Sequence, residues 1–194
     1  MMESVYIYPT DTVWGIGGAV HIEGMAHLVN KIKGHEEVKP LSILFLNLDM
    51  LSDYFMLELL DRDWLIRLFE LEATLGLPTG WMKKEIPEEA YAGSDFICVR
   101  VLDSKAISSM FALSGGPVYT TSFNLKGEKA LSNLEEVIAL KKRIAPKAKL
   151  FESAEALSGH SSTIVLFNEE DNFKILRSGT RVGEIEEHLR LLTT

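Results

Sequence analysis

The segment Leu41–Leu46 is an almost unbroken apolar run, interrupted only by Ser42. A short apolar run of this kind is typical of a β-strand buried on both faces, and Phe96–Leu102 contains a second one. A strand buried on both faces belongs to a sheet with covering layers above and below it. These two runs therefore constrain the chain to a layered fold built around a sheet.

The rest of the chain alternates short β-rich segments with helical patterns. Further strands are expected at Val5–Tyr8, Pro117–Thr121, Leu150–Glu152, Thr163–Phe167 and Phe173–Leu176. Helices are expected at His21–Lys33, at Asp49–Glu72 in at least two pieces, at Ser104–Leu113 with Ser104 as N-cap, and at Gly183–Leu191. Another helix should begin at Ser132-Asn133-Leu134-Glu135, which has the capping-box pattern.

The separation between Phe167 and Phe173 is short and polar, which indicates a hairpin and hence a mixed sheet. Strands interleaved with helices over 194 residues, without a repeat or a long linker, favour one domain. We predict a single α/β domain over residues 1–194.

Composition excludes some functional classes. The formal net charge of −8 argues against a broadly basic surface for nucleic acid. Five basic residues lie within Lys141–Lys149, and this cluster fits a solvated helix end as well as an RNA-binding patch. No apolar stretch reaches the roughly 18 residues of a membrane span, and no secretory signal pattern opens the chain. We expect a cytoplasmic protein that does not interact with membranes.

Several kinds of catalytic centre find no support in the sequence. The single cysteine, Cys98, lies within an apolar run and is interpreted as a buried core thiol; with no second cysteine, no internal disulfide can form. The histidines show no metal-ligand spacing, so no metal site is assigned to them: His21, His27, His35, His160 and His188. No Ser/His/Asp arrangement stands out as a nucleophile system.

Polar segments follow several of the expected strands. Pro9–Gly18 combines the side chains of Thr10, Asp11 and Thr12 with glycines at 15, 17 and 18, as in a loop that lets a ligand approach the backbone. A structural turn explains the same residues equally well. Thr120–Asn124 offers hydroxyls and an amide to a ligand, or a turn followed by a helix N-cap.

Basic residues lie near these polar segments. Lys31 and Lys33, with Lys39 further on, could gather positive charge for phosphates or could interact with the negative end of a helix dipole. Arg100 and Arg177 each end an apolar strand and are candidate anion clamps, although arginines at strand ends are usually surface residues.

Taken in order, these segments resemble the YrdC/YciO family, which includes the threonylcarbamoyl-AMP synthases. The most specific match is Tyr8–Gly17, which is similar to the opening YPT(D/E)T-(V/A)-(Y/F)-G-(L/V)-G of the family. The resemblance continues to about Gly179. Lys31–Lys33 is similar to K-x-R, Lys39–Leu41 to (N/K)-P-L and Val99-Arg100 to V-R. Further on, Thr121–Leu125 is similar to T-S-A-N-L, Ser162–Val165 to S-T-(I/V)-V and Ile175–Gly179 to (I/V)-L-R-x-G.

The resemblance implies a twisted mixed sheet with flanking helices and a concave, positively lined cavity, in a single-domain form. It also implies a nucleotidyltransferase reaction in which threonine, bicarbonate and ATP, with magnesium, give threonylcarbamoyl-AMP and pyrophosphate. In family terms, four residues would bind threonine: Thr12, Arg100, Ser122 and Ser162. Four others would lie at the nucleotide phosphates: Lys31, Lys33, Asn124 and Arg177. Three of these would also be catalytic, namely Lys31, Lys33 and Arg177. Implied partners are downstream tRNA-modifying proteins and tRNA.

Some positions differ from the family pattern. Lys33 replaces the arginine of K-x-R, and the stretch between Lys33 and Lys39 is two residues longer than in the family pattern. Phe123 replaces an alanine that should lie near ligand. The P-G-P-x-T segment is matched only by Leu75–Gly80. These differences favour two alternatives: a non-catalytic protein of the same fold that binds nucleotide or double-stranded RNA, and a related enzyme acting on another amino acid.

Overall fold

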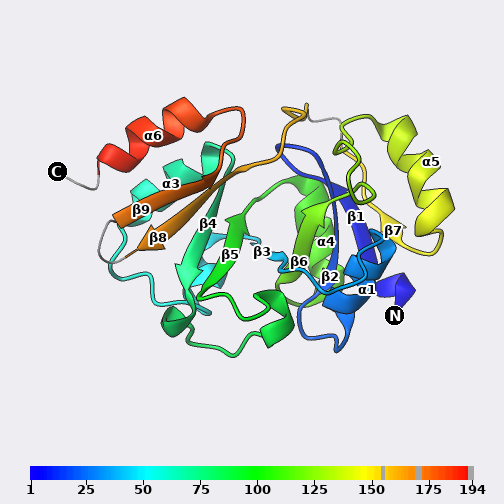
Figure 1. Cartoon of the computed structure of the whole chain (residues 1–194), viewed down its shortest axis with the longest axis horizontal. Helices are drawn as coiled ribbons and strands as arrows, with labels where there is room; N and C mark the ends of the chain where they lie inside the picture. Colours follow the sequence, from blue (N-terminus) through cyan, green and yellow to red (C-terminus); the bar gives the residue numbers. More distant parts are fainter. Residues whose placement is uncertain (154–155, 169–171, 192–194) are drawn as a thin grey trace.

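The computed structural model describes residues 1–153, 156–168 and 172–191, and it contains a nine-stranded sheet with the strand order β7-β1-β2-β6-β3-β5-β4-β8-β9 (Figure 1). The strands are β1 (Val5–Pro9), β2 (Trp14–Ala19), β3 (Ser42–Phe45), β4 (Ala73–Pro78), β5 (Phe96–Val101), β6 (Val118–Ser122), β7 (Lys149–Leu150), β8 (Thr163–Asn168) and β9 (Asn172–Arg177). The pairs β1/β7, β3/β5 and β4/β8 are parallel and the others are antiparallel, which confirms the predicted mixed α/β sheet.

Two strands were not expected from the sequence. The interpretation of Pro9–Gly18 as one loop was wrong, because β2 pairs antiparallel with β1 from Val5↔Gly18 to Pro9↔Trp14. Glycine is depleted in strands, and this hid β2. β4 begins directly after the helix that was predicted to run to Glu72. The predicted hairpin is confirmed by the β8/β9 pairing, while its connecting residues 169–171 lie outside the described residues.

The helices are close to the expected positions: α1 (Met25–Ile32), α2 (Leu48–Ser52), α3 (Arg62–Glu70), α4 (Lys105–Ser114), α5 (Leu134–Ile144) and α6 (Val182–Arg190). The Ser104 cap is confirmed, since its hydroxyl accepts a hydrogen bond from the backbone N–H of Ile107 at 3.3 Å. The cap of α5 is Asn133 rather than the expected Ser132. The Asn133 Oδ1 accepts from the backbone N–H groups of Glu135 and Glu136, which satisfies two otherwise unpaired donors.

Three short 3₁₀ helices complete the described elements: Met2–Ser4, Thr79–Trp81 and Glu88–Ala90. In Figure 1, α6 and α3 lie beside β9, β8 and β4 at one end of the molecule, while α5 lies beside β7 at the other. No helix among the described residues is long and apolar enough to cross a lipid bilayer.

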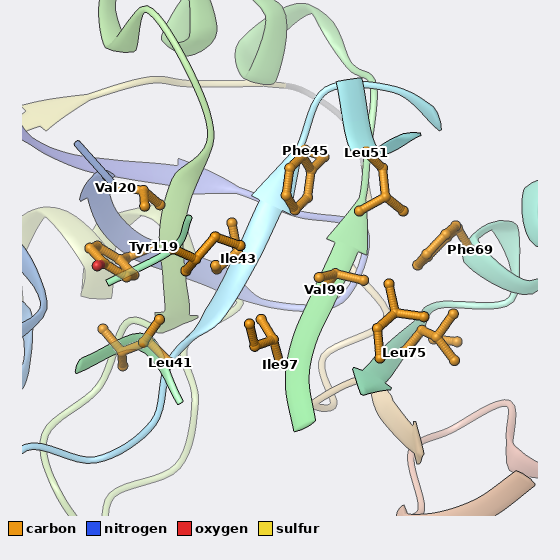
Figure 2. Close-up of a cluster of buried hydrophobic side chains, with 14 of the residues drawn as sticks. Val20, Leu41, Ile43, Phe45, Leu51, Phe69, Leu75, Ile97, Val99 and Tyr119 are labelled. Carbon is orange, nitrogen blue, oxygen red and sulfur yellow. The ribbon is translucent and has the colours of Figure 1, made fainter. Parts of the chain in front are cut away.

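Residues on the two central strands alternate between the core and the opposite face of the sheet. Figure 2 shows Ile43 and Phe45 of β3 beside Ile97 and Val99 of β5, all fully buried. Because strand side chains alternate, Ser42 of β3, Arg100 of β5 and Thr74 of β4 lie on the other face. The hydrophobic core therefore orients a row of polar side chains toward a single surface.

The glycines of β2 serve close packing rather than unusual backbone angles. A Cβ atom at Gly17 would lie 1.5 Å from the carbonyl oxygen of Tyr119 on β6, and one at Gly18 would lie 2.3 Å from the sulfur of Met25 on α1. Neither Gly17 nor Gly18 has a positive φ angle. They allow β6 and α1 to approach β2 more closely than any side chain would permit.

Candidate functional site

A small polar pocket of about 80 Å³ opens on the face of the sheet opposite the central core residues. Its walls carry hydroxyl groups from five strands or their ends, together with two guanidinium groups. The lining residues are Thr10, Thr12, Val13, Gly15, Ser42, Thr74, Arg100, Thr120, Thr121, Ser122, Ser161, Ser162 and Arg177. We call this set the hydroxyl pocket.

One wall of the hydroxyl pocket is an ion pair between β5 and the turn that joins β1 to β2. Arg100 Nη2 donates to both carboxylate oxygens of Asp11, at 2.6 and 2.9 Å, and Nη1 donates to the Thr12 hydroxyl at 3.2 Å. The Thr10 hydroxyl donates to the Val13 carbonyl oxygen at 2.6 Å, which closes the turn. Arg100 therefore holds the turn over the sheet, with its side chain only 8% exposed.

The opposite wall is formed by β4 and the start and end of the β8/β9 pair. The hydroxyls of Thr74 and Ser162 are hydrogen-bonded at 2.7 Å. Arg177 donates to the Ser162 carbonyl oxygen from Nε at 3.0 Å and from Nη2 at 2.9 Å, and Nη2 also reaches the Ser162 hydroxyl at 3.1 Å. Ser162 is thus fixed from two sides.

A third group of contacts lies where β6 ends. Lys33 Nζ donates to the carbonyl oxygen of Ser122 and, at 3.1 Å, to Asn124 Oδ1. The Ser122 hydroxyl also donates to Asn124 Oδ1, at 2.6 Å. Burial lowers the pKa of Lys33 to about 8, since no carboxylate offsets the loss of water around its ammonium group. This lysine is therefore partly neutral just above neutral pH.

The two arginines bring two positive charges to the hydroxyl pocket, and Asp11 is paired with only one of them, Arg100. Arg100 Nε is buried and has no hydrogen-bond partner among the described residues. Burial, followed by the charge of Arg100, lowers the pKa of Arg177, so the two guanidinium groups repel each other. Hydroxyls beside two arginines, only one of which has a carboxylate partner, are suited to a small anionic ligand that also carries polar groups.

The structure brings together most of the residues singled out from the sequence. Thr12, Arg100, Ser122, Ser162 and Arg177 line the hydroxyl pocket, and Lys33 and Asn124 contact its Ser122. It does not bring Lys31 there.

Lys31 is exposed on α1 and lines a separate cavity with His27 and His35. Lys33 is the lysine next to the pocket, through its contact with Ser122.

Two expectations about the pocket walls are corrected. Phe123 does not reach ligand space, because its side chain is fully buried in the hydrophobic core. Leu75 and Leu77 likewise belong to the core, while Thr74 lines the pocket and was missed. The alternation of small and apolar residues in Ala73–Leu77 was the signal that could have identified β4.

Of two further sequence features, Cys98 differs from expectation and the basic cluster at 141–149 agrees with one of its two interpretations. Cys98 is half-buried rather than part of the closed core, and it lies two residues before Arg100 on β5, hence on the same face of the sheet. Burial raises the pKa of its thiol, which keeps it protonated and unreactive. In the 141–149 cluster, Lys141 donates to the Pro146 carbonyl oxygen at 2.9 Å, as expected of a helix end.

The described residues contain no group of three or more His, Cys, Asp or Glu side chains that could hold a metal ion. No carboxylate is among the described residues that line the hydroxyl pocket, and Arg100 engages both oxygens of the neighbouring Asp11. The described residues therefore do not form a magnesium cage, and a magnesium ion at this pocket would have to arrive coordinated by nucleotide phosphates.

The profile of the Sua5_yciO_yrdC family, described as "Telomere recombination", matches residues 2–179. The chain belongs to this family. Among sequence relatives, a threonylcarbamoyl-AMP synthase of Pseudomonas aeruginosa is 31% identical over 129 residues, which is 65% of this chain and 66% of that protein. One of Wigglesworthia glossinidia brevipalpis is 26% identical over 180 residues, 91% of this chain and 88% of that protein.

Solved structures of the Sua5/YciO/YrdC family have the same fold. P. abyssi Sua5 complexed with L-threonine superposes with a TM-score of 0.74 at 20% identity, covering 94% of this chain and 54% of that one. E. coli YciO superposes with a TM-score of 0.69 at 21% identity, covering 91% of this chain and 84% of that one. The chain thus spans about half of Sua5 and just under two thirds of the Pseudomonas relative.

Proposed function

We propose that this protein is a threonylcarbamoyl-AMP synthase, which uses ATP to adenylate the carbamate of threonine and supplies the first step of tRNA threonylcarbamoyladenosine modification. The observation that carries the proposal is the hydroxyl pocket, in which Arg100 and Arg177 lie among threonine and serine hydroxyls; the buried Nε of Arg100 has no hydrogen-bond partner in the part of the chain that the structure describes. Related synthases and the threonine complex of Sua5 support the same assignment.

The reaction suits a site without a strong base. The threonine amine and bicarbonate give a carbamate and water, and the carbamate is already an anionic nucleophile. Its oxygen forms a bond to the α-phosphorus of ATP while the bond between that phosphorus and the bridging oxygen breaks, releasing pyrophosphate. Such a transfer depends on alignment and charge neutralisation, which fixed cationic and hydroxyl groups supply.

The residues divide by their chemistry. Arg100 and the hydroxyls of Thr12, Thr74 and Ser162 would hold the amino acid, whose carboxylate and hydroxyl match a guanidinium and hydroxyl donors. Lys33, with Ser122 and Asn124, would hold the phosphates, and Arg177 lies where it can neutralise charge between the two groups of ligands. Asn124 already bonds Lys33, Ser122 and two backbone carbonyls, so its role is to position them.

The direct test is a pyrophosphate-release assay with ATP, bicarbonate and threonine. We expect release that requires all three reagents, and a product with the mass of threonylcarbamoyl-AMP. A panel of other amino acids in the same assay determines whether threonine is the preferred substrate. ATP binding without pyrophosphate release for any amino acid would contradict the synthase and would leave a nucleotide- or RNA-binding protein of this fold.

Replacing Lys33 with methionine removes the charge but keeps a long apolar chain in the buried position. We expect about 10- to 100-fold weaker ATP binding at pH 7, the range of one charge-assisted contact. In the wild type, ATP affinity should also fall as pH rises through about 8, because Lys33 loses its proton there. Isothermal titration calorimetry at pH 7, 8 and 9 measures both effects.

Lys31→Met is the matched comparison, since Lys31 is exposed near the same helix end and lies away from the hydroxyl pocket. We expect at most a two- to threefold change in ATP affinity for this variant. Equal losses for the two variants, or an unchanged pH profile in Lys33→Met, would contradict the assignment of the phosphate contact to Lys33.

A further inference from the structure

A second cavity, of about 500 Å³, lies at the ends of β3 and β5 beside one face of α3. Its volume is within the range of small-molecule sites, and more than half of its lining side chains are apolar. The apolar lining residues are Leu46, Leu48, Ile66, Phe69, Val101 and Leu102. We call this space the α3 cavity.

The apolar lining of the α3 cavity is incompletely buried. Phe69 belongs to the hydrophobic core and is among the buried side chains drawn in Figure 2. Ile66, three residues earlier on the same helix, is 41% exposed, and Leu46 and Leu102 are half-buried. A ligand with an apolar body would therefore remove hydrocarbon surface from water when it entered the cavity.

The rim of the α3 cavity is acidic. Three carboxylates line it, against one basic residue: Asp11, Glu70, Asp103 and Arg62. Arg62 is exposed and is paired with Asp49 at 2.8 Å. Asp103 has no ion-pair partner among the described residues, whereas the other two carboxylates are paired with arginines. The described residues contain no group of side chains that could hold a metal ion, so the charge of the rim fits an organic cation.

Asp11 connects the α3 cavity to the hydroxyl pocket. Thr10 and Thr12, on either side of it, line the hydroxyl pocket, while Asp11 itself lines the α3 cavity. Arg100 lines the hydroxyl pocket and donates to both carboxylate oxygens of Asp11, at 2.6 and 2.9 Å. A cation in the α3 cavity would therefore compete with Arg100 for the same carboxylate.

We propose that the α3 cavity binds a small apolar amine, and that the bound ammonium group weakens the hold of Asp11 on Arg100. The hydrocarbon body of the amine would cover Ile66 and Leu102. Its ammonium group would donate to Asp103 and would compete with Arg100 for Asp11. The effect on the hydroxyl pocket rests on the proposed function: with Arg100 less well fixed, threonine should bind more weakly. By linkage, bound threonine should weaken amine binding by the same factor.

The probe is hexylamine, compared with 1-hexanol and hexanoate, which keep the hydrocarbon chain but carry a neutral and an anionic group. Dissociation constants are measured by NMR titration of the full chain at pH 7, where an alkylamine is protonated. We expect hexylamine to bind about 3- to 10-fold more tightly than 1-hexanol and to shift the amide signals of Ile66 and Leu102, with hexanoate binding most weakly. Equal affinities for the three compounds, or no binding of hexylamine, would overturn the inference while the proposed function stands.

Asp103→Asn removes the proposed anchor but keeps the oxygen that accepts from the Ser108 hydroxyl at 2.8 Å. We expect the preference for hexylamine over 1-hexanol to fall to about twofold or less. Asp95→Asn is the matched control, because Asp95 is exposed at the other end of β5 and is not among the described residues that line the α3 cavity. Ile66→Gln should weaken both compounds to the same extent. An undiminished preference in Asp103→Asn, or an equal loss in Asp95→Asn, would contradict the role of Asp103.

The competition for Asp11 is measured on Arg100 in the absence of threonine. We expect saturating hexylamine to shift the Arg100 Nε–H signal, assigned from Arg100→Lys, and 1-hexanol to leave it unchanged. With hexylamine present, threonine should bind about fivefold more weakly or worse. If hexylamine binds but neither the Arg100 signal nor threonine affinity changes, the competition is wrong. If threonine does not bind in either condition, the proposed function fails, and hexylamine affinity with the Arg100 signal still decides this inference.

Discussion

Arg100→Ala should reduce kcat/KM for threonine in the pyrophosphate-release assay by about 100-fold or more, the cost of removing a buried charge-assisted contact. Arg100 lines the hydroxyl pocket and holds Asp11 and Thr12 with its Nη atoms, while its buried Nε has no hydrogen-bond partner among the described residues. The substitution therefore removes both a ligand contact and the support for the turn between β1 and β2. Binding of threonine alone, followed by calorimetry, should weaken in the same direction.

Asp11→Asn separates these two effects. The amide keeps the shape of the side chain and one acceptor oxygen, but it loses the charge that balances Arg100. We expect a smaller loss, about 3- to 10-fold, and mainly in the KM for threonine, because the guanidinium stays present but is less well fixed. An Arg100→Ala enzyme that keeps its threonine kcat/KM within about threefold would contradict the assignment of Arg100 to the amino acid.

Gly17→Ala should be among the most destabilising single-methyl changes in this chain. The added Cβ would lie 1.5 Å from the Tyr119 carbonyl oxygen, and this neighbour is backbone on a paired strand rather than a movable side chain. Relief requires β2 to separate from β6 near the centre of the sheet. We expect a loss of about 4 kcal/mol or more in the free energy of unfolding, which exceeds ordinary substitutions.

For a domain of this size, such a loss lowers Tm by about 8–16 °C, measurable by circular dichroism or calorimetry. Gly80→Ala is the control, because no atom lies within 4 Å of its added Cβ and its φ angle is not positive. A change within about 0.5 kcal/mol is expected there. A Gly17→Ala protein as stable as Gly80→Ala would mean that the two strands can separate at little cost.

The order of elements and the mixed sheet could be predicted from the sequence, because long apolar runs such as Leu41–Leu46 specify buried strands whatever their neighbours. The strand β2 could not, since Gly17 is required by the close approach of the Tyr119 backbone, which comes from a distant part of the chain. A local pattern contains no information about such neighbours. The same limit explains why Thr74 was missed: its role depends on Ser162, 88 residues later.

The candidate site shows a similar division. Motifs identified Thr12, Arg100, Ser122, Ser162, Asn124 and Arg177 as one group, and the structure places them around or beside one pocket. What motifs could not decide was the direction in which a side chain points. Lys31 and Lys33 differ by two positions, or about 200° around a helix, so they project in nearly opposite directions. Phe123 directly follows the pocket residue Ser122 at the end of β6, yet its side chain is buried in the core.

The sequence separations within the hydroxyl pocket have a consequence for folding. Its walls join Thr12 to Arg100 and Thr74 to Ser162, each across 88 residues, so each wall forms only when segments far apart in the sequence come together. Contacts of such high contact order form late, after the intervening strands have closed their loops. Ligands should consequently bind only the folded sheet. They should raise the free energy of unfolding by mass action without accelerating the early steps of folding.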